Sequence, residues 1–374
     1  MKPPPPIRVL HIIHRLDRDR GSTSWLLVSL SNKSQYPIQH LICSTSAEPG
    51  DREEEFIRAG IPVVHIPLSY AFPFPYIIKL IKLLKSSNCD VLHSHMAWHG
   101  GFDVLAGFIA RVKLRIVYFH SGDWLFAHHP LRAIFARFLK ALCLLFGNQY
   151  WGASKGVLQN WFSENAEHKK NVKPVHGGIR FNTLSLPGQI ESKKMLGLPG
   201  ESKVIAHIGR FTYQKNHEMI LTVFKEVLIH DNNCFLVLIG DGPLLKDTRQ
   251  LADELGIAGH VKFLGVRTDI AHCLNAMDVF FLPSRYEPLG LVLLEAQDIG
   301  LPIVASDIQG LKEAVAPIWS HNLISVNDTK GFSKTLINAL SEKRQRPDSF
   351  LDFFSEENAS RRLYQAYKSN IPEG

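Results

Sequence analysis

The sequence predicts an α/β protein with two doubly wound domains, each a parallel sheet covered by helices on both faces. Short β-branched, apolar runs alternate with longer segments whose apolar residues recur at helical spacing, a pattern typical of strands buried on both faces. This alternation occurs as two series, and residues 177–202 between them carry Gly-Gly and Pro-Gly turn signals instead. A chain of 374 residues also suits two domains better than one core.

Each series contains six candidate strands. In the first half they are Arg8–Ile13, Gln39–Cys43, Pro62–Ile66, Asp90–Ser94, Arg115–Phe119 and Gln149–Gly152. In the second half they are Val204–Ile208, Phe235–Ile239, Val261–Leu264, Val279–Leu282, Ile303–Ser306 and Leu323–Val326. We therefore expect a Rossmann-like domain over residues 1–178 and a second one over 179–354. An amphipathic helix over Ser355–Asn370, within residues 355–374, is expected to cross back to the first domain.

Composition and cysteine usage narrow the class of protein. Apolar residues make up 45% and charged residues 21%, which is globular and excludes disorder, collagen and coiled coil. The five cysteines are far apart and form no C-x-x-C pair, which favours a reducing compartment over a disulfide framework. The start has no apolar signal region, and no apolar run approaches the ~18–20 residues needed to cross a bilayer. We expect a cytoplasmic protein, soluble or peripheral on the inner face of the membrane.

The charge is unevenly distributed along the chain. Residues 1–180 carry 22 Lys and Arg against 12 Asp and Glu, a net +10, whereas residues 181–374 carry 20 against 23, a net −3. A basic first half indicates an anionic partner: nucleic acid, an anionic membrane or a phosphorylated substrate. Two segments mix cations with apolar side chains. We interpret Leu131–Phe146 as a sheet-covering helix, and for Tyr70–Lys85 a membrane-facing helix is equally favoured.

The loop after the first strand of the second half has the residues of an anion site. Strand Val204–Ile208 is followed by Arg210, Lys215 and Asn216, and then by a helix. Asn216 is expected to cap that helix, whose N-terminal amides attract negative charge. Two cations beside a helix start suit a diphosphate. The alternative is an ordinary solvated loop.

A second group of residues follows strand Val279–Leu282. Glu287 lies in the loop, Gly290 supplies a turn before the next helix, and Glu295 lies inside that helix. A carboxylate accepts hydrogen bonds from two hydroxyl groups at once, as a sugar requires, and glycine lets backbone amides approach a phosphate. The alternative is that both glutamates serve the helix alone, one of them by complementing its dipole.

Taken together, these stretches resemble the GT-B, family 4 retaining glycosyltransferases, and within that family the exopolysaccharide and capsule enzymes. The residues that carry the resemblance are Gly209-Arg210, Gln214-Lys215-Asn216, Ile239 to Pro243, Phe263 to Arg267, Glu287 to Gln297 and Gly300 to Ser306. The resemblance is good from about Val204 to Glu313 and weaker before it. It implies two Rossmann-like domains facing a cleft and a metal-independent transfer.

The resemblance also implies roles for single residues. The catalytic set would be Arg210, Lys215, Glu287 and His120, and the donor-binding set Glu295, Gly290, Leu291, Leu289, Gly265, Val266 and Gly21. No cofactor and no metal are expected. The donor would be a nucleotide-diphosphate sugar and the acceptor a glycan, often lipid-linked, in surface polysaccharide synthesis. A nucleic-acid partner is not expected, because the basic residues accompany no recognition motif.

Some features fit this resemblance less well, and two other functions stay open. The family usually has a Gly pair after its first strand, and this chain has only Gly21 there. Asp17-Arg18-Asp19 matches a metal-binding D-x-D triplet, which we interpret as loop charge, and we prefer structural roles for His93 and His95 over a metal site. The alternatives are a sugar-nucleotide epimerase of the same fold and a non-catalytic nucleotide-sugar binding protein.

Overall fold

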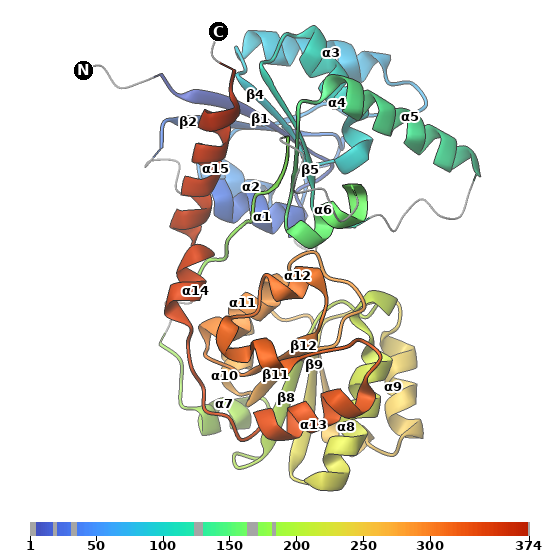
Figure 1. The fold of residues 1–374 in the computed structure, drawn as a ribbon, viewed down its shortest axis with the longest axis vertical. Helices are drawn as coiled ribbons and strands as arrows, with labels where there is room; N and C mark the ends of the chain where they lie inside the picture. Colours follow the sequence, from blue (N-terminus) through green and yellow to red (C-terminus); the bar gives the residue numbers. More distant parts are fainter. Residues whose placement is uncertain are drawn as a thin grey trace. The chain divides into compact units, whose positions relative to one another are not determined.

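The chain folds into two compact units. The computed structural model describes residues 5–17, 21–30, 36–122, 130–162, 171–181 and 185–372, with backbone only for residues 21, 22 and 130–132. One unit is Met1–Arg180 together with Phe353–Gly374, and the other is Phe181–Asp352. Our sequence-based divisions fall after residues 178 and 354. Each unit is a parallel sheet flanked by helices, so the predicted fold class is confirmed (Figure 1).

The described sheet of the first unit has the strand order β3-β2-β1-β4-β5-β6-β7, with parallel pairings throughout. The strands are β1 (Ile7–Ile13), β2 (Ile38–Ser44), β3 (Val63–His65), β4 (Val91–Ser94), β5 (Leu114–Phe119), β6 (Gln149–Gly152) and β7 (Val172–Pro174). The helices are α1 (Gly21–Leu30), α2 (Glu53–Arg58), α3 (Phe74–Ser86), α4 (Gly101–Ile109), α5 (Pro130–Phe146), α6 (Lys155–Phe162) and α15 (Glu356–Asn370). The prediction of six strands missed β7, because Lys173 and Pro174 leave no apolar run in Val172–Pro174.

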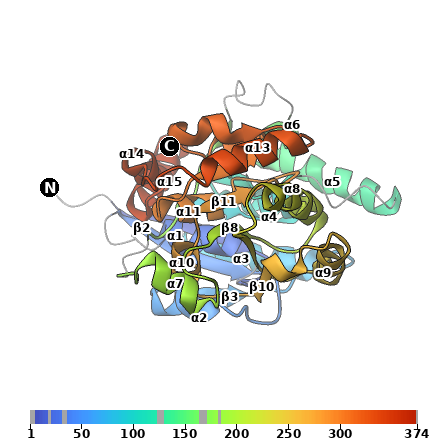
Figure 2. The same cartoon turned by 90° about the horizontal axis from the view of Figure 1, so that it is seen from below.

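The central strand β1 shows why the strands of this unit are apolar throughout. Val9 and Ile13 point into the core beneath α1 and α15, whereas Leu10 and Ile12 point into the core beneath α3 and α4. Successive side chains of a strand alternate between faces, so a strand covered on both sides needs apolar residues on both. Helices α3, α4 and α5 lie side by side on the second face (Figures 1 and 2).

The last helix, α15, packs on the first unit although it follows the second in sequence. Ser360 Oγ donates a hydrogen bond to the Ser29 carbonyl oxygen of α1 at 3.0 Å. Leu363 and Tyr367 are buried against the sheet, and Tyr367 Oη lies 2.7 Å from His93 Nδ1. These contacts tie the end of the chain to β4 and α1.

The described sheet of the second unit has the order β10-β9-β8-β11-β12-β13 and is also parallel. The strands are β8 (Lys203–Ile208), β9 (Cys234–Ile239), β10 (Val261–Gly265), β11 (Val279–Leu282), β12 (Ile303–Ser306) and β13 (Leu323–Ile324). The helices are α7 (Gln189–Met195), α8 (His217–His230), α9 (Leu245–Glu254), α10 (Ile270–Asn275), α11 (Leu291–Asp298), α12 (Gln309–Lys312), α13 (Thr329–Ala339) and α14 (Asp348–Phe353). Because the strands are parallel, the loops after β8 to β11 leave the same edge of the sheet.

Candidate functional site

Glycines hold the loop after β8 against the ends of the neighbouring strands. The Gly209 amide donates to the Ile239 carbonyl oxygen at 2.9 Å, and the Gly240 amide to that of Gly265 at 2.8 Å. Gly240 has φ 138°, and a Cβ there would lie 2.1 Å from the Gly209 oxygen. Only glycine permits such an approach, so the carboxyl ends of β8, β9 and β10 form one closely packed backbone edge.

The two predicted cations of this loop have different surroundings. Arg210 is exposed, and its guanidinium forms no hydrogen bond or ion pair with the described part of the chain. Lys215 ends the 3-10 turn Tyr213–Lys215, its side chain is only 15% exposed, and Nζ is ion-paired with Glu287. Arg210 is therefore available to an anion, whereas Lys215 is held beside a carboxylate.

Glu287 is a buried carboxylate with compensated charge. The residue is 5% exposed, and its Oε1 accepts hydrogen bonds from Lys215 Nζ and, at 3.0 Å, from Ser284 Oγ. A buried charge needs such partners, because it has lost its hydration. Within the described residues, Oε2 has no hydrogen bond. The site thus holds one carboxylate oxygen in place and leaves the other as an acceptor.

Asn216 joins the two loops, but not in the predicted way. It has left-handed backbone, φ 59° and ψ 47°, and its side chain forms no capping hydrogen bond at the start of α8. The amide Nδ2 instead donates to the Pro283 carbonyl oxygen at 3.1 Å. The capping prediction was wrong, because the side chain is turned toward the neighbouring loop. Gln214 Nε2 makes a parallel connection to the Tyr286 carbonyl oxygen at 2.9 Å.

The start of α11 places backbone amides next to Glu287. Leu289 is buried, Gly290 has left-handed φ of 73°, and Leu291 is the first residue of the helix. Gly310 lies beneath this turn, where a Cβ would be 2.0 Å from the Glu287 carbonyl oxygen. The first amides of a helix have no partner inside it and favour an anion. Close packing against Gly310 holds them at the same edge as Lys215.

Glu295 lies on α11, beyond these amides. Part of its side chain is exposed, yet the surrounding protein and, secondarily, the charge of Asp298 raise its pKa to about 7. Crowding by protein atoms raises a carboxyl pKa because it disfavours the charged form. Glu295 is therefore poised to change charge near neutral pH, and a hydrogen-bond donor would favour its ionised form.

Gly265 and Val266 leave an open space at the end of β10. Gly265 has φ 65°, and a Cβ there would meet no atom within 4 Å. Val266 is 72% exposed. An exposed apolar side chain beside open backbone offers a surface on which a flat ring can stack.

In the first unit, His120 follows β5, is partly exposed and lies at the end of a series of buried histidines. Its Nε2 lies 2.8 Å from His95 Nδ1, and burial lowers the pKa of His120 to about 3. His95 Nε2 lies 3.1 Å from His11 Nδ1, and His11 Nε2 lies 3.1 Å from His40 Nδ1. The pKa values of His11 and His95 are lowered by burial as well, so these rings are neutral.

Two other predictions concern residues between β1 and α1. Gly21 is the first residue of α1, but Arg18 and Asp19 of the D-x-D triplet lie outside the described residues. The carboxylate of Asp17 accepts a hydrogen bond from Arg15 Nε at 2.6 Å.

The described residues include one histidine trio that resembles a metal site. Ring nitrogens of His11, His93 and His95 lie within 4.8 Å of one another. The rings of His93 and His95 are stacked, with centroids 4.2 Å apart and planes 23° apart, so their in-plane lone pairs do not converge. The His11 and His95 nitrogens are already at hydrogen-bond distance. The trio fits packed, hydrogen-bonded rings better than metal ligands.

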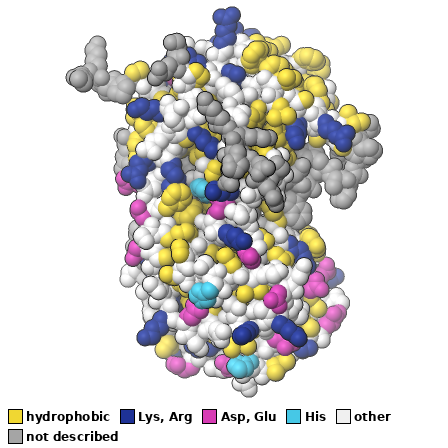
Figure 3. All heavy atoms as spheres, viewed as in Figure 1, with side chains coloured by type: hydrophobic (Ala, Val, Ile, Leu, Met, Phe, Trp, Pro, Cys, Tyr) yellow, Lys and Arg dark blue, Asp and Glu magenta, His cyan; other side chains and the backbone are white. Residues whose placement is uncertain are grey.

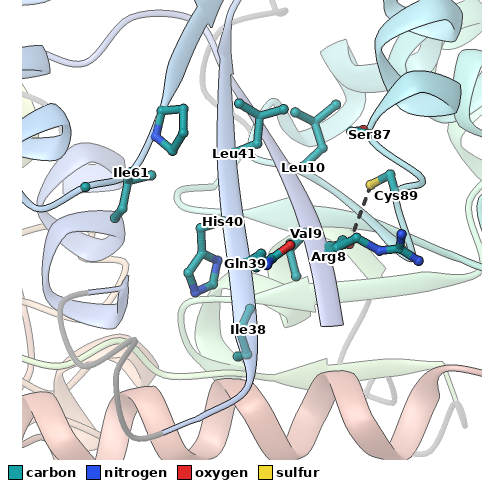
Figure 4. Close-up of a pocket in the computed structure, with 12 residues that line it drawn as sticks. Arg8, Val9, Leu10, Ile38, Gln39, His40, Leu41, Ile61, Ser87 and Cys89 are labelled. Carbon is teal, nitrogen blue, oxygen red and sulfur yellow. Dashed lines mark hydrogen bonds between the residues drawn. The ribbon is translucent and has the colours of Figure 1, made fainter. Parts of the chain in front are cut away.

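A cavity of about 400 Å³ lies at the amino ends of β1 and β2 in the first unit. Figure 4 shows the side chains around it, with Arg8 and Cys89 on one side and His40 and Ile61 on the other. His120 lies at the opposite, carboxyl edge of this sheet. The cavity is therefore separate from the predicted site residues.

Comparisons with known proteins decide the family. Residues 188–350 match the family model "Glycosyl transferases group 1", and residues 38–152 match "Glycosyltransferase Family 4". The chain belongs to the family 4 glycosyltransferases. Together the two models account for most of both units of this glycosyltransferase, and both describe glycosyl transfer.

Three named relatives of this chain are described as glycosyltransferases. It is 26% identical to the putative glycosyltransferase EpsF of Bacillus subtilis over 80% of this chain and 79% of that protein. It is 26% identical to the capsular polysaccharide biosynthesis glycosyltransferase CapH of Staphylococcus aureus, over 81% of this chain and 82% of CapH. It is 28% identical to an Escherichia coli UDP-Gal:alpha-D-GlcNAc-diphosphoundecaprenol alpha-1,3-galactosyltransferase, over 81% of this chain and 80% of that enzyme.

Solved structures share the fold at low identity. Anabaena HepE, in complex with UDP and glucose, is 18% identical with a TM-score of 0.72, covering 97% of this chain and 100% of HepE. A glycosyltransferase from Rickettsia africae is 17% identical with a TM-score of 0.81, covering 99% of this chain and 100% of that one. These likenesses identify the two-domain GT-B fold of the glycosyltransferase.

Several residues of the site had no signal in the sequence. Ser284 orients Glu287, and Gly310 makes room for its backbone. His207 donates through Nδ1 to the Phe281 carbonyl oxygen at 3.0 Å, and His217 stacks on Phe211 with ring centroids 4.0 Å apart. Burial lowers the pKa of both histidines, that of His217 to about 4, so they support the loop without adding charge. A single His in a strand or at a helix start does not reveal such contacts.

Proposed function

We propose that this glycosyltransferase moves a hexose or N-acetylhexosamine from a nucleotide-diphosphate sugar to a lipid-linked glycan, with retention of configuration and without a metal ion. The observation that carries the proposal is the arrangement of Glu287, fixed by Lys215 and Ser284, in the same loop system as the exposed Arg210. The E. coli relative is named for a UDP-galactose donor and a diphosphoundecaprenol-linked acceptor, which supports this donor and acceptor class.

The proposed roles follow the chemistry of each group. Arg210, Lys215 and the amides at the start of α11 meet the diphosphate, Oε2 of Glu287 accepts from sugar hydroxyls, and Glu295 accepts from the ribose. Gly265 and Val266 border the base. His120 reaches the donor sugar through Nδ1. Bond breaking puts negative charge on the diphosphate, and each fixed donor that meets it contributes about 3–4 kcal/mol to the transition state.

Retention and metal independence belong to the same proposal. The acceptor attacks on the face that the diphosphate leaves, and the acceptor proton passes to the leaving oxygen. No carboxylate base is then required on the opposite face of the sugar. The fixed cations take the place that a divalent ion has in other transferases, so an excess of chelator should leave the rate unchanged.

The experiment is a transfer assay with a panel of nucleotide sugars and a polyprenyl-diphosphate-linked acceptor. Arg210→Ala and Lys215→Ala should each lower kcat by about a hundredfold or more. Lys225→Ala, which removes an exposed cation from α8, should leave kcat unchanged. Near-normal rates in both site variants would overturn the assignment. Sugar release or inversion with donor alone would indicate hydrolysis or the epimerase instead.

A membrane surface on the first unit supports the lipid-linked acceptor. Among the described residues, no helix is both long and apolar enough to cross a bilayer. Helices α3 and α5 and the turn before α3 nevertheless expose large apolar side chains, which we call the α3–α5 surface: Phe72, Phe74, Ile78, Ile134, Phe138, Leu144 and Leu145. Lys79, Lys82 and Arg137 lie among them, and Figure 3 shows hydrophobic and basic side chains together over these helices. Apolar side chains with cations suit an anionic bilayer.

Flotation with anionic vesicles tests the α3–α5 surface, and Phe74→Ser with Ile134→Ser should abolish co-flotation. The matched control is Ile229→Ser, because Ile229 of the second unit is equally apolar and 75% exposed. Equal flotation of both proteins would retire the membrane proposal.

A further inference from the structure

Four imidazoles of the first unit are joined head to tail, and we call them the histidine chain: His40, His11, His95 and His120. The first three are buried and His120 is partly exposed. They come from β2, β1, the residue after β4 and the residue after β5, which lie side by side in the sheet. In every link a δ1 nitrogen meets an ε2 nitrogen. The three distances are 3.1, 3.1 and 2.8 Å.

Head-to-tail linkage couples the tautomers of neutral rings. A neutral imidazole carries one N–H and one lone pair, so a ring that donates through Nδ1 must accept through Nε2. If His11 donates through Nδ1, then His95 accepts at Nε2 and must donate through its own Nδ1. Each ring must therefore have the same tautomer as its neighbour. The chain therefore has two states, with Nδ1–H throughout or with Nε2–H throughout.

Burial disfavours a second proton on these rings and so keeps each imidazole neutral. His11 is fully buried and His95 is 7% exposed. A second proton on either ring would place a donor against a donor and an uncompensated charge in the core. The lowered pKa values of His11, His95 and His120 agree with neutral rings at physiological pH.

The end of the chain is the predicted site residue. His120 Nε2 is engaged by His95, while Nδ1 makes no hydrogen bond with the described part of the protein. The tautomer that the linked rings share determines whether Nδ1 of His120 is a donor or an acceptor. At the far end, His40 borders the cavity at the amino ends of β1 and β2.

We propose that His40, His11 and His95 are positioning residues: their linkage locks the tautomer of His120 to their own and so defines the hydrogen bond that His120 offers to the donor sugar. This rests on the proposed function for the role of His120, but the locking itself does not. A rate depends on the fraction of molecules in the competent form, so loss of the lock lowers kcat without removing a substrate contact.

His93 is a matched control for this proposal. It is paired with His11 across β1 and β4, is equally buried and lies on the same face, but its Nδ1 bonds to Tyr367 Oη and its Nε2 has no partner among the described residues. A Phe at either position removes one buried imidazole. It leaves one polar partner, Tyr367 Oη, unsatisfied at position 93 and two, His40 Nδ1 and His95 Nε2, at position 11. Only the Phe at position 11 interrupts the histidine chain.

The first test is nuclear magnetic resonance of the whole protein labelled with ¹⁵N-histidine, with rings assigned from single variants. The ring nitrogen shifts should show His11, His95 and His120 protonated at the same position, δ1 or ε2 in all three. His11→Phe should leave His120 as a mixture of tautomers, and His93→Phe should not. Different tautomers within the wild-type chain would overturn the proposal, as would stoichiometric zinc in protein purified without chelator.

The second test is kinetic. His11→Phe should lower kcat roughly three- to tenfold with the donor KM little changed, and His93→Phe should stay within about twofold. His11→Gln, which still links one donor to one acceptor, should recover most of the rate. If His11→Phe does not fold, His40→Phe interrupts the outer link instead. Equal loss in the His11 and His93 variants would indicate a packing effect and sink the proposal. Wild-type protein with aligned tautomers but no transfer would instead refute only the proposed function.

Discussion

The two units hold their candidate residues in opposite ways. In the second unit, Arg210, Lys215 and Glu287 lie in loops at the carboxyl edge of the sheet, where Lys215 is ion-paired with Glu287 and Arg210 is exposed. In the first unit, the partly exposed His120 ends a row of hydrogen-bonded imidazoles that begins in the core. The difference teaches that charged groups in this enzyme are positioned by ion pairs and close-packed glycines, and neutral groups by strand register.

The largest effect should come from breaking the ion pair of the second unit. Glu287→Ala would leave Lys215 buried without its partner, so we expect about 3–5 kcal/mol less stability and near-complete loss of transfer. Denaturant unfolding and the transfer assay measure the two effects. Glu226→Ala, an exposed carboxylate of α8, should change neither. The double variant with Lys215→Ala should lose less than the sum of the single losses; full additivity would show that the pair is not coupled.

Gly310→Ala tests whether close packing holds the Glu287 loop. The new Cβ would lie 2.0 Å from the Glu287 carbonyl oxygen, so the turn before α11 must move. We expect a loss of about 2–3 kcal/mol and a weaker donor affinity, measured by thermal unfolding and calorimetry. At Gly259 a Cβ would meet nothing within 4 Å, so Gly259→Ala is the control. Unchanged donor affinity in Gly310→Ala would show that the position of the Glu287 loop does not affect donor binding.

The pH dependence of donor binding should come from Glu295 of the second unit and not from His120 of the first. Glu295 has a pKa of about 7, and the ionised form accepts the hydroxyl donors, so donor affinity should rise about tenfold from pH 6 to 8. Glu295→Gln should flatten this rise in a titration of donor binding. His120, with its pKa of about 3, contributes no titration in that range. A rise that persists in Glu295→Gln would assign it to another group.

The contribution of Glu295 to folding stability should fall as the pH rises, whereas donor affinity rises. The folded-state pKa of Glu295 lies above its ordinary value of 4.5, so protonation is favoured in the folded protein. This contribution is complete below about pH 4.5 and is lost as the pH rises toward 7. Comparison of wild type with Glu295→Gln isolates it.

The smallest effect is expected at Gly265. Its φ of 65° disfavours a side chain, although there is open space around it. Gly265→Ala should cost about 1 kcal/mol, whereas Gly265→Asn, which tolerates left-handed backbone, should cost less. Thermal unfolding gives the order of the two variants. The reverse order would show that contacts, and not backbone conformation, decide this position.

Local patterns predicted most of the fold and the charged part of the site. Apolar runs such as Val204–Ile208 and Val279–Leu282 are visible in the sequence because a strand buried on both faces needs apolar residues throughout. The loops after them carry Arg210, Lys215 and Glu287, and parallel strands bring such loops to one edge. Strand β7 was missed because Lys173 and Pro174 leave no apolar run there, and Asn216 was assigned a capping role because the sequence does not show the neighbouring Pro283 carbonyl.

The sequence by itself determined the two-sheet architecture, the position of the charged loops and the basic character of the first half. Only the tertiary structure decided that Lys215 is held by Glu287, that Gly310 supports the turn before α11, and that His11, His40 and His95 form a chain with His120. The physical reason is that hydrophobic periodicity is a local property. Pairing across strands depends on register, which brings together residues far apart in the chain.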